Sequence, residues 1–231
     1  MTGPRWAESA LRRDGTIVHA CTKGGGEGLT AFGKEMVREF NRVGMMVDLS
    51  HVHAATMRSA IAASRAPVLF SHSGARAVCP HPRNVPDDVL PLVRANGGVV
   101  CVTFVSAFVS GPIRNTPGGK ATLAQVADHV VHIRDAIGID HVGLGGDYDG
   151  CTELPVGLEN TGCYVGLTAE LLRRGFSEDD VAKVLGGNTL RVWAAAEAVA
   201  RRMVAEGALP SVARIDDLDG AGAGAGGGGG E

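Results

Sequence analysis

A chain of 231 residues is long enough to form one domain with a substantial core, and 45% of its residues are hydrophobic. Charged residues make up 20% and the formal net charge is −3, so nothing in the composition indicates a nucleic acid or an anionic membrane surface as a partner. Aromatic residues make up only 4%, which predicts a core built mostly from Val, Leu, Ile and Ala.

The cysteines and the chain ends bear on the cellular compartment. Five cysteines lie far apart and form no C-x-x-C pair, which argues against a cysteine-ligated zinc site. We interpret most of them as buried thiols in a reducing compartment, with an extracellular protein carrying one disulfide as the alternative. No apolar run approaches the ~18 residues that a membrane span needs. The charged N-terminal segment lacks the apolar stretch of a secretory signal, so we expect a cytoplasmic location.

Short apolar runs alternate with amphipathic stretches along the chain. Five runs lack polar alternation, as strands buried on both faces do: Thr16–His19, Met45–Leu49, Val68–Ser71, Gly98–Phe104 and His141–Gly145. Helices are predicted at about 30–43, 54–63, 87–95 and 122–137, with two or three more over 165–206. This alternation predicts an α/β fold with a parallel sheet, either a barrel or an open doubly wound sheet.

Several predicted helices carry boundary signals. Thr30 precedes the first helix and Gly44 follows it, as an N-cap and a C-cap would. Pro86 with Asp87 and Asp88 is predicted to open the third helix, with the acidic residues in its first turn.

Three predicted strands end in residues that can bind or activate a metal ion. The first two end in Ser-His pairs, at His51 and His72, and the third runs into Asp147. The carboxyl ends of the strands in a parallel barrel open on one face, where active sites form. Two neutral imidazoles can bind one Zn²⁺, and a nearby aspartate can take a proton from water. A single such histidine is more often structural, but two Ser-His strand ends separated by one helix favour ligation.

The order of motifs resembles the membrane (renal) dipeptidase family, which comprises zinc peptidases among the amidohydrolase-like metal-dependent barrels. The resemblance extends from about residue 16 to about residue 198. It rests on eight segments in one order: Gly28–Gly33, Val47–Val52, Ser64–Val68, Ser71–Ser73, Pro82–Asp88, Gly145–Gly150, Pro155–Asn160 and Leu167–Arg174.

The resemblance implies a binuclear zinc site and a dipeptide substrate. His51 and His72 match the two histidine ligands of one of the zinc ions, and Asp147 matches the aspartate that contacts the bridging water. His19 matches a histidine that binds substrate and stabilises the tetrahedral intermediate. Arg83 matches the arginine that holds the terminal carboxylate, a task that suits a guanidinium fork.

Departures from the family pattern concern the second zinc ion. The family's His-x-Asp pair and its bridging glutamate lie upstream of the region that matches His19, and residues 1–15 contain no histidine. Phe108 falls near a position where relatives carry a tyrosine. The chain therefore resembles a partial TIM (β/α)8 barrel of about five C-terminal strands that keeps ligands for one of two zinc ions.

The domain prediction follows from this comparison. We expect an irregular N-terminal remnant over 1–15, the barrel domain over 16–206 and a disordered Gly/Ala-rich tail over 207–231.

Three functions are compatible with the sequence. The first is a metal-dependent dipeptidase, with weak metal binding and little or no activity expected for this chain alone. The second is a non-catalytic barrel fragment that acts as a scaffold or binds a partner. The third is another metal hydrolase of the same barrel, such as a deaminase or a lactonase. Relatives are often dimeric and some are lipid-anchored, so a homodimer remains an option, whereas this sequence shows no anchor.

Other polar residues were weighed against structural roles. Asp48 is a candidate for supporting His51, and a structural role at the strand is the alternative. His51 and His53 form a His-x-His pair of the kind seen in other metal hydrolases. His129 and His132 share a helical face at i, i+3 spacing and are predicted to lie on a solvated surface.

Overall fold

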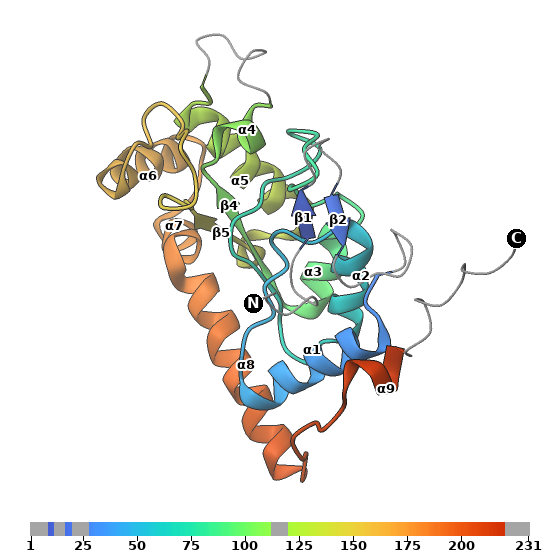
Figure 1. Ribbon diagram of the computed structural model, residues 1–231. Helices are drawn as coiled ribbons and strands as arrows, with labels where there is room; N and C mark the ends of the chain where they lie inside the picture. The colour runs from blue at the N-terminus through green and yellow to red at the C-terminus, as the bar shows by residue number, and fades with distance from the viewer. Residues whose placement is uncertain (1–8, 12–16, 20–27, 112–119, 220–231) are drawn as a thin grey trace, which may run out of the picture.

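The computed structural model describes residues 28–111 and 120–219, together with the backbone of Ser9–Leu11 and Ile17–His19 (Figure 1). The strands are β1 (Ser9–Leu11), β2 (Ile17–His19), β3 (Leu69–Phe70), β4 (Val99–Thr103) and β5 (Val142–Gly145). The α-helices are α1 (Ala31–Val43), α2 (Ala54–Ala63), α3 (Leu90–Asn96), α4 (Ser106–Val109), α5 (Leu123–Ile137), α6 (Tyr164–Arg173), α7 (Glu178–Ala182), α8 (Asn188–Ala205) and α9 (Ile215–Asp219).

A parallel sheet with the strand order β3-β4-β5 forms the centre of the described part. The segment 45–49 extends this sheet beside β3 through a parallel bridge between Asp48 and Leu69. Leu49 N donates to Leu69 O at 2.7 Å, and Leu69 N donates to Val47 O at 2.9 Å. Four of the five predicted strand regions thus lie side by side in chain order, and the predicted α/β class with parallel strands is confirmed.

The strand predicted at Thr16–His19 departs from this arrangement. β2 covers Ile17–His19, but it pairs antiparallel with β1 in a separate two-stranded sheet. The prediction that this run joins the parallel sheet is therefore wrong for the structure described here. β1 itself lies within the N-terminal segment for which we expected irregular structure.

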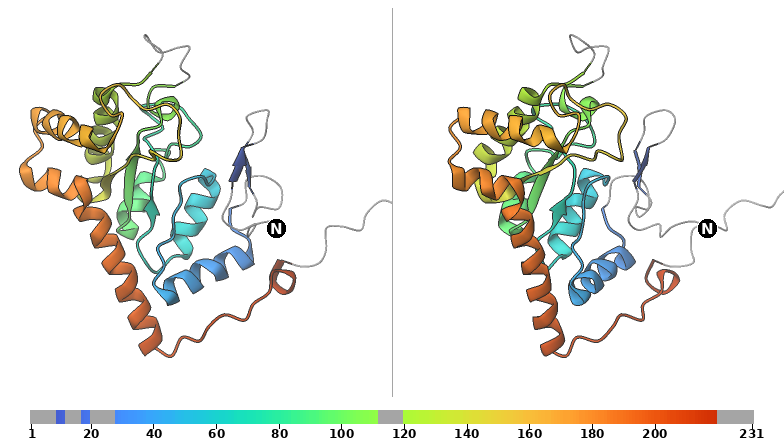
Figure 2. Two further views of the ribbon diagram at one scale, coloured as in Figure 1. Left: turned by 60° about the vertical axis from the view of Figure 1, so that its left-hand side comes forward. Right: turned by 90° about the vertical axis from the view of Figure 1, so that its left-hand side faces the viewer.

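Alternate side chains of the strands divide the core between the two faces of the sheet. On one face, Phe70, Val100 and Val102 pack in the main hydrophobic cluster together with buried side chains of α2, α3 and α5. Val99 and Cys101 point the other way and pack against Val192 of α8. The described strands therefore form an open sheet that has helices on both faces (Figure 2).

Most predicted helix ends are confirmed, and α3 is the exception. Thr30 Oγ1 accepts from Gly33 N at the start of α1, and Gly44 ends that helix in the left-handed conformation. α3 begins at Leu90 rather than near residue 87, and its first turn contains no acidic residue. Asp87 and Asp88 instead lie in the preceding turn, where they pair with His132 of α5 and Arg58 of α2.

The segment that follows α8 folds back along α1. Ser211 N donates to Glu39 Oε2 at 3.3 Å, and Phe32 N donates to Asp219 Oδ1 at 3.1 Å. The carboxylate of α9 thus satisfies a free N–H group at the start of α1. Residues 207–219, which belong to the expected tail, thus pack along α1, and residues 220–231 lie outside the described part.

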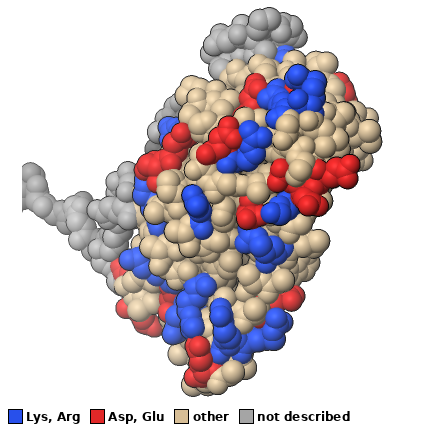
Figure 3. Space-filling view, turned by 180° about the vertical axis from the view of Figure 1, so that it is seen from behind, with Lys and Arg blue, Asp and Glu red and all other residues tan. Residues whose placement is uncertain are grey.

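The surface shows mixed charges on the face seen from behind, where acidic and basic side chains are interspersed (Figure 3). Ion pairs such as Arg174 with Asp128 and Lys183 with Asp140 are examples of this mixing. Within the described residues, no helix combines the length and the apolar character that crossing a bilayer requires.

Candidate metal centre

Two histidines converge where neighbouring strand regions end. His51 follows the segment 45–49 and His72 follows β3, and their Nε2 atoms lie 2.8 Å apart. The ring centroids are separated by 4.8 Å with an interplanar angle of 67°. The two imidazoles therefore direct the same ring atom at one point, as two ligands of one ion do.

The backbone of the two strand ends brings these rings together. His51 has a φ of 78°, in the left-handed region that non-glycine residues rarely adopt. Ser50 Oγ accepts from His72 N at 2.9 Å and therefore joins the two strand ends just beside the rings. Ser50 Oγ also lies 3.1 Å from Ser73 Oγ, so the hydroxyl is held from both sides.

A hydrogen-bond chain fixes the protonation of His72. Ser71 Oγ donates to Asp48 Oδ2 and lies 2.7 Å from His72 Nδ1. Because the hydroxyl proton is used toward the carboxylate, His72 Nδ1–H donates to Ser71 Oγ. Nε2 of a neutral His72 then carries a lone pair toward His51, which is the arrangement that metal-binding histidines need.

Burial favours the neutral form of both rings. It lowers the pKa of His51, and the positive charge of Arg83 lowers this pKa further. Burial also lowers the pKa of His72, and the Asp147 carboxylate opposes this shift. A neutral imidazole is the form that binds a metal ion.

Asp147 lies at the end of β5 beside the two rings. Its Oδ2 atom is 3.9 Å from His72 Nε2, and its φ is 55°, again in the left-handed region. The three strand ends that the sequence singled out are therefore brought together in space.

The donor set fits one side of a zinc site. A tetrahedral zinc ion with Zn–N bonds of about 2.0–2.1 Å would hold two nitrogens about 3.3 Å apart. The Nε2 atoms of His51 and His72 lie 2.8 Å apart, within hydrogen-bonding distance, so a shift of about half an ångström would admit the ion. Over residues 28–111 and 120–219, however, no group of three or more His, Cys, Asp or Glu side chains could hold a metal ion. The described residues thus offer two candidate ligands, His51 and His72.

Arg83 lies near this centre with unused hydrogen-bonding capacity. Its Nε and Nη2 atoms are buried and have no hydrogen-bond partner among the described residues. Burial lowers the pKa of Arg83, and the charges of Asp147 and Asp48 oppose this shift. The guanidinium is therefore a charged group with free donors close to the Asp147 carboxylate.

The structure describes three further candidate residues to different extents. The backbone of His19 ends β2, and its side chain lies outside the described part of the chain. His53 caps α2, with Nδ1 accepting from Ala55 N at 3.2 Å. Asp48 supports His72 through Ser71, and no hydrogen bond connects it to His51.

A profile of the membrane dipeptidase family (peptidase family M19) matches residues 2–207. The chain belongs to the membrane dipeptidase family.

Solved structures agree with this membership of the membrane dipeptidase family. The chain is similar to the probable dipeptidase PvdM from Pseudomonas aeruginosa, with 26% identity, a TM-score of 0.68, and coverage of 74% of this chain and 55% of that one. It is also similar to a metallo peptidase from Rhodobacter sphaeroides liganded with a phosphinate mimic of the dipeptide L-Ala-D-Ala. That match has 31% identity and a TM-score of 0.66, and it covers 74% of this chain and 48% of that one. An amidohydrolase from Pseudomonas aeruginosa matches with 32% identity and a TM-score of 0.65, with coverage of 73% of this chain and 57% of that one. The chain spans about half the length of these structures.

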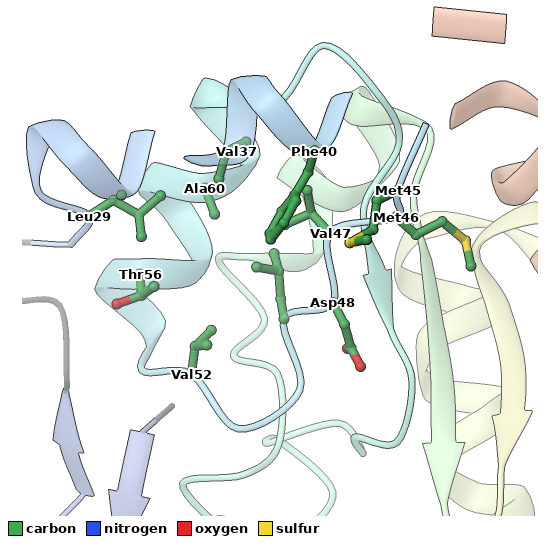
Figure 4. Close-up of a pocket in the computed structure, with 12 residues that line it drawn as sticks. Leu29, Val37, Phe40, Met45, Met46, Val47, Asp48, Val52, Thr56 and Ala60 are labelled. Carbon is green, nitrogen blue, oxygen red and sulfur yellow. The ribbon is translucent and has the colours of Figure 1, made fainter. Parts of the chain in front are cut away.

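An apolar cavity of about 240 Å³ lies beside the segment 45–49, on the side away from β3 (Figure 4). Side chains of α1 and α2 line it, among them Val37, Phe40 and Ala60, and neither His51 nor His72 does. The cavity is therefore separate from the histidine pair of this membrane dipeptidase family member.

Proposed function

We propose that this chain carries part of the active site of a metal-dependent dipeptidase, with His51 and His72 as ligands of a zinc ion. The observation that carries the proposal is the 2.8 Å approach of the two Nε2 atoms, with the Nδ1 proton of His72 held by Ser71. Membership of a family described as membrane dipeptidases supports the same reaction class.

In this proposal, different residues of the chain have different roles in hydrolysis. Zinc bound at such a site supplies Lewis acidity and makes hydroxide available near neutral pH. Asp147 is placed to accept a proton at Oδ2 from the attacking water and to pass it to the departing amine nitrogen. Burial favours the neutral form of His51 and His72, and zinc ligation would replace the hydrogen bond that joins their Nε2 atoms.

Arg83 binds the terminal carboxylate of the dipeptide in this proposal. Its unpaired Nε and Nη2 atoms are donors that a carboxylate can accept in two parallel hydrogen bonds. The metallo peptidase from Rhodobacter sphaeroides carries a mimic of L-Ala-D-Ala, a ligand of the same class. By resemblance, His19 takes the role of polarising the scissile carbonyl.

We further propose that residues 45–206 form part of a (β/α)8 barrel. The parallel strands follow one another in chain order, as barrel strands do, and each is followed by at least one helix. The site then lies at the carboxyl ends of the strands, which is the face where barrel enzymes place their chemistry.

A non-catalytic role is the second candidate. It is favoured by one observation: the described residues offer two ligands, whereas catalytic zinc sites have three protein ligands.

A panel of dipeptides and cyclic amides would separate the dipeptidase from another hydrolase of the same barrel.

Zinc stoichiometry tests the proposed function directly. We expect the full chain to bind zinc in an equilibrium titration with a chromophoric competitor, and the variants His51→Ala and His72→Ala to lose that binding. His132→Ala is the matched control, because this histidine lies on α5 and pairs with Asp87. Equal zinc binding by the wild type and by both ligand variants would contradict the proposal.

A further inference from the structure

A stack of three side chains lies beside the metal centre. The ring of His81 packs on the ring of Phe108, with centroids 4.3 Å apart and an interplanar angle of 27°. The guanidinium carbon of Arg83 lies over the same Phe108 ring, 4.9 Å from its centroid. His81 Nδ1 also accepts from Arg83 N at 3.2 Å. His81 therefore contacts both the ring that supports Arg83 and the backbone that carries it.

Buried hydrogen bonds fix the two segments that form the stack. Asn84, next to Arg83, is fully buried and donates from Nδ2 to Phe108 O at 2.7 Å and to Cys79 O at 3.0 Å. Its Oδ1 accepts from Gly74 N at 2.8 Å. The loop that carries Arg83 and the helix that carries Phe108 are thus joined by one side chain that uses its whole amide group.

The stack leaves one edge of the guanidinium without hydrogen bonds. A cation over an aromatic face is held by the ring quadrupole and needs none of its N–H groups for that contact. Nε and Nη2 of Arg83 are the atoms that remain unpaired. These atoms lie along one edge of the planar fork, which is the edge that binds a carboxylate through two hydrogen bonds.

The charge of His81 is consistent with a neutral stacking partner. Burial, with smaller contributions from the charges of Arg83 and Arg76, lowers the pKa of His81 to about 4. At neutral pH the imidazole therefore adds no positive charge beside Arg83 that would compete for the same anion.

We propose that His81 and Phe108 are positioning residues that aim the Arg83 guanidinium at a free carboxylate of the ligand. This inference rests on the proposed function and assigns two residues that act through Arg83. Its consequence is selectivity: a ligand with a free terminal carboxylate binds more tightly than the same ligand with a terminal amide.

The test compares Ala-Gly with its C-terminal amide in calorimetric titrations of the zinc-supplied full chain. For the wild type we expect Ala-Gly to bind about tenfold more tightly, because a charge-assisted pair is replaced by neutral hydrogen bonds in the amide. Phe108→Leu removes the ring, and His81→Asn keeps an acceptor near Arg83 N while removing the stack. Both should reduce the ratio to about twofold and leave the affinity for the amide unchanged.

Three controls make this result specific. Phe108→Tyr keeps the ring and should keep the ratio, and Arg83→Lys should lose it because the fork is gone. His132→Ala should change neither affinity. A purely structural role for the stack would weaken both ligands in parallel and lower the thermal midpoint, and that result would overturn the inference.

The remaining outcomes separate this inference from the proposed function. If Phe108→Leu and His81→Asn keep the tenfold ratio, the inference is overturned while the dipeptide site stands. If the wild type binds both ligands equally, the carboxylate role of Arg83 and this inference fail together. If the wild type binds neither ligand, the proposed function itself fails and the inference fails with it.

Discussion

A β-carbon built on Gly145 would lie 1.8 Å from the carbonyl oxygen of Ser71. The end of β5 therefore lies so close to Ser71, which follows β3, that only glycine fits at position 145. Ser71 precedes His72, and Gly145 lies two residues before Asp147. This contact thus sets how near the aspartate comes to the histidine pair.

Gly145→Ala should destabilise the chain and disturb the site at the same time. The new methyl group meets backbone rather than a flexible side chain, so we expect a loss of about 1–3 kcal/mol in the free energy of unfolding, or more. Urea denaturation measures this loss. Gly166→Ala in α6 is the matched control, since its β-carbon would meet only the end of the Leu123 side chain at 3.3 Å. Equal stability of the two variants would contradict the prediction.

Ser71→Ala should weaken zinc binding without unfolding the chain. The change removes the group that accepts from His72 Nδ1, so the ring is no longer held in the required tautomer and orientation. Loss of such an outer partner typically costs about 10–100-fold in metal affinity. Competition titration with a chromophoric chelator measures the effect.

The control for this change is a serine far from the site. Ser177→Ala removes the cap of α7 and should lower stability by about 1 kcal/mol while leaving zinc affinity unchanged. Unchanged zinc affinity in Ser71→Ala would show that the hydrogen bond from His72 to Ser71 has no role in ligation.

The meeting of His51, His72 and Asp147 could be predicted from the sequence, because the carboxyl ends of parallel strands gather at one edge. The support that Asp48 gives to His72 through Ser71 could not. It depends on how the segment 45–49 is aligned with β3, and the sequence of one strand does not specify its alignment with a neighbouring strand.

Two other differences have identifiable causes. β2 has the composition of a buried strand, but composition does not specify which strand becomes its partner. His129 is fully buried rather than solvated, because it lies on the face of α5 that Val126 and Ile133 bury. The spacing i−3 and i+4 around residue 129 was a readable signal for that burial.

His129→Leu should destabilise the fold although the new side chain is apolar. His129 Nδ1 accepts from Ala75 N, and its Nε2–H donates to Val109 O, at 2.9 Å in each case. Leucine leaves both backbone groups buried and unpaired, at a cost of about 1–3 kcal/mol for each group. Urea denaturation checks this value, and His132→Leu, at a half-buried position on the same helix, should stay within about 0.5 kcal/mol. A loss in His129→Leu as small as in the control would contradict the prediction.

His81 should make the stability of the chain depend on pH in the acid range. Its folded-state pKa is lowered to about 4, mainly by burial, whereas an exposed histidine in the unfolded chain titrates near its ordinary value of 6.5. Between these values the unfolded chain binds the proton and the folded chain does not. The free energy of unfolding therefore falls as the pH decreases from 6.5 toward 4, and this contribution is fully present only above pH 6.5.

His81→Asn removes this titration, so the variant should lose less stability than the wild type between pH 7 and pH 5. Other buried histidines also contribute to the slope, and the difference between the two proteins isolates the part that belongs to His81. Urea denaturation of His81→Asn and of the wild type at both pH values provides the measurement. An identical slope in His81→Asn and the wild type would mean that His81 accepts its proton as readily in the folded chain as in the unfolded one, and a neutral stacking partner for Phe108 would then be excluded at pH 5.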